Sequence, residues 1–340
     1  MTSLPLTHIR RRNKKKSIMR DSFIHGMRLA LAALWAVFLL SSCIDEDLSD
    51  CGKDYRIDYT VHLRTSITTE MSAHLATPAE QAIGSQVLAG LRDVFTDHAR
   101  DIDLAFYTAD HMLAQHEQHQ MDASQASYTI YLPVKDYSHV ALADAAAEPL
   151  VSAEGSAQLG TFAVRQTPAD TIDSHSVGLF SARLPMHVED RDQEFHVNLY
   201  MLNAASCLLL SAGDVRPDRV WGYADGLADA FSLSDSLYTA SRNTVVRERM
   251  LHEPQGNTYA LYAATMPSAG TAPWHIYIYV AIGGKTTLTT LTVDDPLRAG
   301  TLRVLKGAIR ADGSVATDTK GVGVSVKLDW KPGGSHDIEI

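Results

Sequence analysis

Apolar and polar residues alternate along much of this 340-residue chain, which is the pattern of β-strands with one buried face. The clearest case begins at Tyr55, where five apolar side chains alternate with five polar ones as far as Arg64. Shorter patterns of the same kind predict further strands in the first half, at 102–108, 128–132, 138–143, near 160–164 and at 177–188. The first half of the chain is therefore expected to consist mainly of short strands.

One helix is clearly indicated. Thr77, Pro78 and Glu80 occupy the N-cap, N1 and N3 positions of a capping box. Apolar side chains follow at helical spacing from Ile83 to Phe95. The sequence therefore predicts a helix over 78–99, within the N-terminal domain.

The second half of the chain repeats the β pattern after a charged break at 189–193, where we place a domain boundary. Gly283-Gly284 is typical of a tight turn between two strands. The strands expected here are 195–201, 206–210, 259–265, 274–282, 286–293, 301–309 and 322–330. We therefore expect an all-β protein with two tandem β-sandwich domains, 54–189 and 190–340, and one helix in the first of them.

The first 42 residues have the features of a secretory signal. A basic stretch leads into the uncharged apolar run 29–40, which is too short for an ordinary membrane-spanning helix. Leu40-Ser41-Ser42-Cys43 then resembles the cleavage motif of bacterial lipoproteins. The prediction is a signal peptide at 1–42, with translation starting at Met1, Met19 or Met27, and a lipid on Cys43; the alternative is an ordinary secretory signal with a chance cysteine.

Residues 43–53 form an acidic segment that we interpret as a lipidated tether. Ile44, and not an aspartate, follows Cys43, which favours the outer membrane over retention at the inner membrane. The acidic cluster from Asp45 to Asp50 resembles the surface-export signals of Bacteroidales lipoproteins. A lipid-anchored, surface-exposed location is therefore expected.

The charge of the chain is divided unevenly. The formal net charge is −10, but residues 1–42 contain eight basic residues and one acidic residue, whereas the rest contains 22 basic and 39 acidic residues. Once the signal is removed, the net charge is −17. Nucleic acid is not expected as a partner, because phosphate binding requires a basic surface.

Candidate chemistry is sparse, since no nucleophile elbow, phosphate-binding loop or zinc-helix motif is present. His111, His116 and His119, with Glu117 between them, could bind a metal or could lie on a polar surface, and we favour the surface. We expect no catalytic residue, no metal, no cofactor and no small-molecule substrate, so the protein is not expected to be an enzyme.

Three further features each allow two interpretations: an aromatic segment, two cysteines and the last predicted strand. Tyr277 and Tyr279 could form an exposed contact for carbohydrate or protein, or could belong to a strand buried on both faces, which we favour. Cys207 is expected in the core, and Cys51 could pair with it or remain a free thiol.

The last predicted strand could close its own domain or could be exchanged with a neighbouring subunit. Its apolar positions, which are the candidate strand-exchange residues, are Val322, Val324, Val326, Leu328 and Trp330.

Both ends of the mature chain resemble one family. The segment from Cys43 to Cys51, with its acidic residues and Asp47-Leu48-Ser49, is similar to the mature start of the FimB-type fimbrial anchor proteins of Bacteroidales, the fimbrillin-A-associated anchor family. The ending from Leu328 to Ile340 is also similar, whereas Gly52 departs from the proline that is common there.

This resemblance implies two transthyretin-like β-sandwich domains and a mechanical role. Such proteins are held in the outer membrane by their lipid, form the base of a fimbria and bind pilin subunits. Cys43 corresponds to the lipid-bearing position and Cys51 to the second cysteine. The alternative function is a surface lipoprotein that binds glycans or host proteins through the same scaffold.

Overall fold

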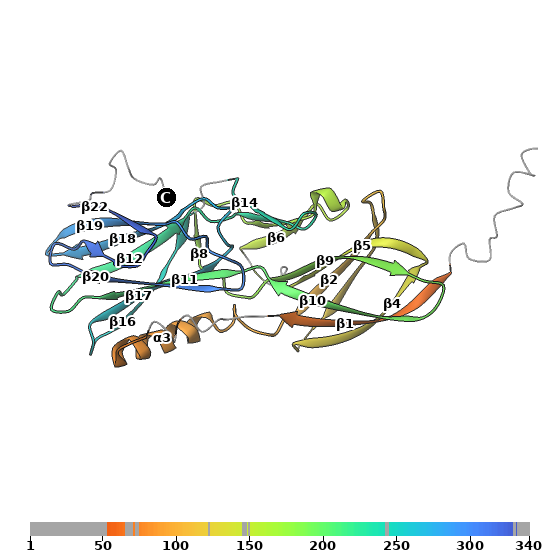
Figure 1. The fold of residues 1–340 in the computed structure, drawn as a ribbon, viewed down its shortest axis with the longest axis horizontal. Helices are drawn as coiled ribbons and strands as arrows, with labels where there is room; N and C mark the ends of the chain where they lie inside the picture. Colours follow the sequence, from red (N-terminus) through yellow and green to blue (C-terminus); the bar gives the residue numbers. More distant parts are fainter. Residues whose placement is uncertain are drawn as a thin grey trace, which may run out of the picture. The chain divides into compact units, whose positions relative to one another are not determined.

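The computed structural model describes residues 53–64, 71, 75–121, 123–144, 148, 150–241, 245–328 and 331 (Figure 1). The expected signal peptide at 1–42, the tether up to residue 52, Cys43, Cys51 and Trp330 lie outside the described residues. Asp54–Ile340 form one compact unit. Within the described ranges, no helix has the length and apolar character needed to cross a membrane.

The first sandwich is a seven-stranded sheet that folds over onto itself, with the strand order β3-β2-β5-β9-β10-β1-β4. β9 and β10 pair only at Ser181–Tyr200 and Phe180–Met201, so the sheet bends there into two layers. Tyr59 of β1 reaches across the core to hydrogen-bond with His139 of β5. The strands are β1 (Asp54–Arg64), β2 (Asp101–Tyr107), β3 (Leu113–Gln120), β4 (Gln125–Pro133), β5 (Lys135–Ala143), β9 (Phe180–Val188) and β10 (Gln193–Met201).

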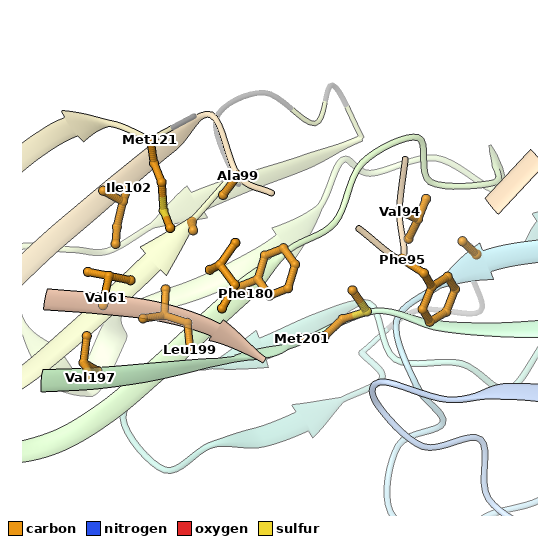
Figure 2. Packing of buried hydrophobic residues seen from close by; sticks show 14 of the residues in the cluster. Val61, Val94, Phe95, Ala99, Ile102, Met121, Phe180, Val197, Leu199 and Met201 are labelled. Carbon is orange, nitrogen blue, oxygen red and sulfur yellow. The ribbon is translucent and has the colours of Figure 1, made fainter. Parts of the chain in front are cut away.

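The alternation predicted for β1 is confirmed, because every odd-numbered side chain from residue 55 to 63 is buried while the even-numbered ones are half-buried or exposed. β1 pairs in parallel with β10 and antiparallel with β4. Figure 2 shows Val61, Val197 and Leu199 from β1 and β10 pointing into the same core as Phe180. The local sequence pattern therefore set which face of β1 is buried.

The second sandwich consists of two facing sheets. Their orders are β16-β17-β11-β20-β21 and β22-β19-β18-β12-β15-β8. Leu208 and Leu261 from the first sheet and Ile276, Ile278 and Leu291 from the second share one buried cluster. The strands are β8 (Thr171–Asp173), β11 (Ala204–Ser211), β12 (Arg219–Asp225), β15 (Val245–Arg247), β16 (Arg249–Glu253), β17 (Thr258–Thr265), β18 (Trp274–Ile282), β19 (Lys285–Val293), β20 (Leu302–Ile309), β21 (Val315–Ala316) and β22 (Val322–Lys327).

A fourth, four-stranded sheet has the order β14-β13-β7-β6. Its residues Val164 and Phe231, together with Phe162 just before β7, share a buried cluster with Tyr107 and Val140 of the first sandwich. The strands are β6 (Val151–Glu154), β7 (Ala163–Gln166), β13 (Ala230–Ser232) and β14 (Leu237–Thr239). The chain is thus all-β with sandwich-like layers, as expected.

Between β18 and β19, Gly283 and Gly284 both have positive φ, as the predicted tight hairpin turn requires.

The pairing of other strands does not follow the domain boundary expected between residues 189 and 190. β10 lies after it and completes the first sheet, whereas β8 lies before it and pairs with β15 of the second sandwich. Both β10 and β8 are held in these sheets by hydrogen bonds to strands that are far away in the sequence.

The helix α3 (Pro78–Leu91) begins where predicted, with the full capping box of Thr77 and Glu80. It is shorter than the expected 78–99, and it packs on β16 and β17 of the second sandwich and not on the N-terminal one. Small side chains of that sheet, including Ala205, Ala260 and Cys207, share the buried cluster of its apolar side. The assignment of the helix to the N-terminal domain is therefore corrected.

The end of the helix has a local cause and a tertiary one. Asp93, Thr96 and Asp97 are weak helix formers, and the Thr96 hydroxyl accepts a bond from the backbone N–H of His98. Val94 and Phe95, which prolong the apolar pattern, are buried after the helix has ended (Figure 2). Their apolar side chains therefore indicate burial in the core and do not indicate that the helix continues.

Candidate functional site

The C-terminal strand β22 lies at the edge of the six-stranded sheet and pairs antiparallel with β19. None of its six residues is buried. Val324 is 44% exposed and Val326 is 42% exposed, and the next residue but one, Leu328, is 57% exposed. The strand is therefore held by main-chain hydrogen bonds with little support from side-chain burial.

The exposed valines point toward the inside of the sandwich. Val324 is paired with Leu291, which is fully buried, so both side chains lie on the inner face of the sheet. The facing sheet ends in β21, which has two residues and pairs with β20 only at Ala308 and Ile309. We attribute the exposure of the valines to this short last strand, which leaves the sandwich open opposite β22.

The structure thus places Val322, Val324 and Val326 in a strand of their own domain, with Leu328 directly after it. An edge strand that exposes apolar side chains is a typical site of pairing with another chain. Exchange of this strand between subunits stays a prediction.

Cys207 lies on β11, is fully buried and forms no disulfide with any described residue. Burial raises the pKa of its thiol well above the usual range, and the nearby carboxyl of Glu248 raises it further. The thiol is therefore chemically inert, as expected of a core cysteine. Its pairing with Cys51, which lies outside the described residues, stays a prediction.

The three candidate histidines are not brought together. His116 and His119 project from opposite faces of β3, since they are three residues apart in a strand, and His111 lies in the preceding turn. His116 approaches Asp103 at 3.3 Å, and His119 approaches Glu117 at 2.9 Å. The described residues contain no group of three side chains suited to a metal ion.

Tyr279 is only 3% exposed and stacks on Trp221 with ring centroids 5.1 Å apart. Tyr277 is half-buried, and its hydroxyl donates to Asp225 at 2.8 Å. Burial raises the pKa of Tyr277, and the Asp225 carboxylate adds to the effect. The aromatic segment thus fits a strand covered on both faces better than an open contact surface.

The structure also contains a buried acid that sequence reasoning missed. Glu248 is 6% exposed, and neither of its carboxyl oxygens has a hydrogen-bond partner among the described residues. It lies against Gly222 and Leu261, and burial raises its pKa to about 8. In the sequence it stands between Arg247 and Arg249, which gave no sign of burial.

A second missed feature is a buried polar cluster around His175, where the crossovers between the two sandwiches meet. Asn203 Oδ1 accepts from the backbone N–H of Leu179 at 2.6 Å, so Asn203 Nδ2 donates to His175 Nδ1 at 3.0 Å. The proton of the neutral ring is then on Nε2, which lies 3.2 Å from Gln166 Nε2. Since an amide nitrogen only donates, the Gln166 side chain accepts this proton in the flipped orientation that presents Oε1. Burial lowers the pKa of His175 to about 4, opposed by the carboxylate of Glu148.

No protein-family model and no curated protein matches this chain. Several solved structures share its fold. A candidate polysaccharide-binding protein from Bacteroides thetaiotaomicron has a TM-score of 0.52 and 10% identity, and the match covers 78% of this chain and 99% of that one. This likeness shows a common fold across most of the chain.

Two further structures are similar at lower scores. A candidate adhesin from Bacteroides ovatus has a TM-score of 0.49 and 10% identity, covering 83% of this chain and 96% of that one. The fimbrial anchor protein Mfa2 from Porphyromonas gingivalis has a TM-score of 0.46 and 9% identity, covering 81% and 99%.

Proposed function

We propose that this protein is a lipid-anchored outer-membrane protein that attaches the base of a fimbria to the cell surface and binds the first pilin of its stalk. The observation that carries the proposal is the order of features at the start of the chain: a basic stretch, a short apolar run, Leu40-Ser41-Ser42-Cys43, and an acidic segment. The all-β fold, shared with a candidate polysaccharide-binding protein from Bacteroides thetaiotaomicron, agrees with the fold that the family resemblance implies.

Anchoring is assigned to acyl chains on Cys43. Each buried methylene contributes about 0.8 kcal/mol, so several chains on one residue hold a protein stably in a membrane, whereas one chain does not. Residues 44–53 contain four acidic residues and serve as a solvated tether. In this proposal the folded unit that begins at Asp54 is displayed at the outer surface.

Pilin docking is assigned to strand addition at β22. No strand of the described part of the chain pairs with its outer edge, and Val324 and Val326 expose apolar surface beside it. Main-chain hydrogen bonds would supply affinity, and the alternate side chains would supply specificity. The partner would be a pilin segment in extended conformation.

The test of anchoring is Cys43→Ala in cells that produce the fimbria, with Cys51→Ala as the matched control. We expect Cys43→Ala to lose labelling by radioactive palmitate and to release fimbriae into the medium, while Cys51→Ala retains both label and fimbriae. Fimbriae that stay on Cys43→Ala cells at normal density would refute the anchoring role.

A further inference from the structure

A cleft of about 490 Å³ opens where the paired ends of β9 and β10 meet the hairpin β13–β14. β9 and β10 separate beyond Ser181 and Tyr200, because β9 follows β5 and β10 follows β1 along their lengths. The cleft lies at this fork, and its volume is within the range of ligand-binding pockets.

The walls of the cleft are aromatic. Tyr200 is 62% exposed, the largest value for a large hydrophobic side chain among the described residues. Phe231 and Tyr238 lie on the other side with ring centroids 4.6 Å apart. The Tyr238 hydroxyl donates to the backbone oxygen of Leu202 at 3.0 Å, which fixes that ring. One aromatic wall is thus open to solvent and the other is held in place.

The polar groups of the cleft are donors and neutral acceptors. His196 and Asn198 lie on the same face of β10 as Tyr200, because they alternate with it along the strand. Arg183 of β9 also lines the cleft, and its guanidinium donates to the backbone oxygen of Ser234. Among the described residues, no carboxylate lines the cleft, although the chain after residue 42 has a net charge of −17.

We propose that this cleft binds one or two pyranose rings of a neutral or carboxylate-bearing saccharide. The electron-rich face of a tyrosine attracts the C–H groups of a sugar ring, while amide, imidazole and guanidinium groups bond to its hydroxyl groups. The absence of lining carboxylates and the presence of Arg183 disfavour a cationic ligand. This inference does not rest on the anchoring role.

An extended peptide between β9 and β10 is the other occupant to consider. Pro185 lies in the middle of β9 and has no N–H to donate, so it interrupts the ladder that an added strand would form there. The structure therefore favours the saccharide.

The experiment is ligand-observed NMR with the full chain in detergent micelles. The probes are maltose, N-acetyllactosamine, methyl β-glucuronide and N-acetylneuraminic acid. We expect saturation transfer to at least one probe, a Kd about tenfold higher for Tyr200→Ala, and retained binding for Tyr200→Phe. The control is Tyr131→Ala, which removes an exposed tyrosine on β4, outside the cleft, and leaves the Kd unchanged.

Unchanged thermal unfolding would establish that Tyr200→Ala is folded, as its exposure predicts. Absence of transfer to all four probes, or equal binding by Tyr200→Ala and wild type, would overturn the proposal. Binding of an alternating valine–threonine peptide, with no saccharide bound, would assign the cleft to polypeptide instead. Cells that carry Tyr200→Ala should retain their fimbriae. A loss of saccharide binding by this variant is therefore distinguishable from a failure of the anchoring role.

Discussion

The two sandwiches each bury an ionisable side chain, and they treat it in opposite ways. In the first, His139 is fully buried but has a partner at each ring nitrogen: Ala105 O lies 3.0 Å from Nδ1, and the Tyr59 hydroxyl bonds to Nε2. In the second, Glu248 is buried with no hydrogen-bond partner among the described residues. A buried neutral histidine with both nitrogens paired stabilises its core, whereas a buried carboxyl without partners costs stability unless it is protonated.

The comparison also predicts opposite pH dependence. The backbone oxygen of Ala105 requires a proton on Nδ1, so Nε2 accepts from Tyr59 and the ring is neutral. Burial lowers the pKa of His139 to about 4, opposed by the Ala105 bond, and raises that of Glu248 to about 8. Acid therefore weakens the first core, and alkali weakens the second.

The largest effect is expected for Glu248. Between its unfolded pKa of 4.5 and its folded pKa of about 8, the native state binds more protons, so the stability from this group is complete below pH 4.5 and is lost as the pH rises. The loss reaches about 5 kcal/mol at 1.36 kcal/mol per unit. Urea unfolding should show Glu248→Gln more stable than wild type at pH 8, with little difference at pH 4.5.

The control for this prediction is Glu194→Gln, because the Glu194 side chain is 78% exposed. It should follow the wild-type curve throughout. A wild type and a Glu248→Gln variant with parallel curves from pH 4.5 to 8 would show that Glu248 has a partner or a solvated position in solution.

Removal of the paired histidine is expected to cost nearly as much. His139→Ala leaves the buried hydroxyl of Tyr59 without a partner and removes the ring that stacks on Phe106 with centroids 4.4 Å apart. We expect a loss of about 4 kcal/mol in the free energy of unfolding at pH 7.5. His187→Ala, whose side chain is 64% exposed, should cost less than about 1 kcal/mol, and equal costs would contradict the pairing.

At acid pH, the first sandwich is expected to be the one that loses stability. The unfolded state binds the proton of His139 more tightly between pH 6.5 and 4, so its contribution is complete above pH 6.5 and is lost as the pH falls through that window. The expected loss is about 3 kcal/mol. His175 adds to the same limb, because burial lowers its pKa as well.

The measurement is the slope of unfolding free energy against pH, for wild type and for His139→Ala. The variant should have a shallower acid limb, with a remaining slope to which His175 and the carboxyl groups of lowered pKa, Glu80 and Asp312, contribute. An unchanged slope would mean that His139 does not titrate with unfolding.

The smallest effect on stability is expected for substitutions in the edge strands β3 and β22. These two strands differ in the side chains that they expose. β3 presents glutamine, histidine and glutamate, side chains that discourage pairing with another chain, whereas β22 presents valines. Val326→Lys should change the free energy of unfolding by less than about 1 kcal/mol, since the side chain is already 42% exposed.

The same substitution should nevertheless remove most fimbriae from the surface if β22 docks the pilin. Gln118→Lys on β3, also exposed, is the matched control and should leave their number unchanged. Electron microscopy of labelled cells would count them, and equal numbers for both variants would exclude docking at β22.

Part of the candidate site was predictable from the sequence. The apolar alternation from Val322 to Val326 correctly predicted a strand. Its exposure was not predictable, because it results from the short facing strand β21. The histidine group failed as a site for a local reason, since His116 and His119 fall on opposite faces once residues 113–120 form a strand.

The sequence by itself determined the features that depend on neighbouring residues. The buried face of β1, the capping box at Thr77 and the turn at Gly283-Gly284 each involve contacts or backbone angles within a few positions. Only the tertiary structure decided that α3 packs on the second sandwich, that β10 pairs with β1, and that Glu248 is buried. The physical reason is that these outcomes depend on surfaces and hydrogen bonds from segments far away in the chain, which no local pattern records.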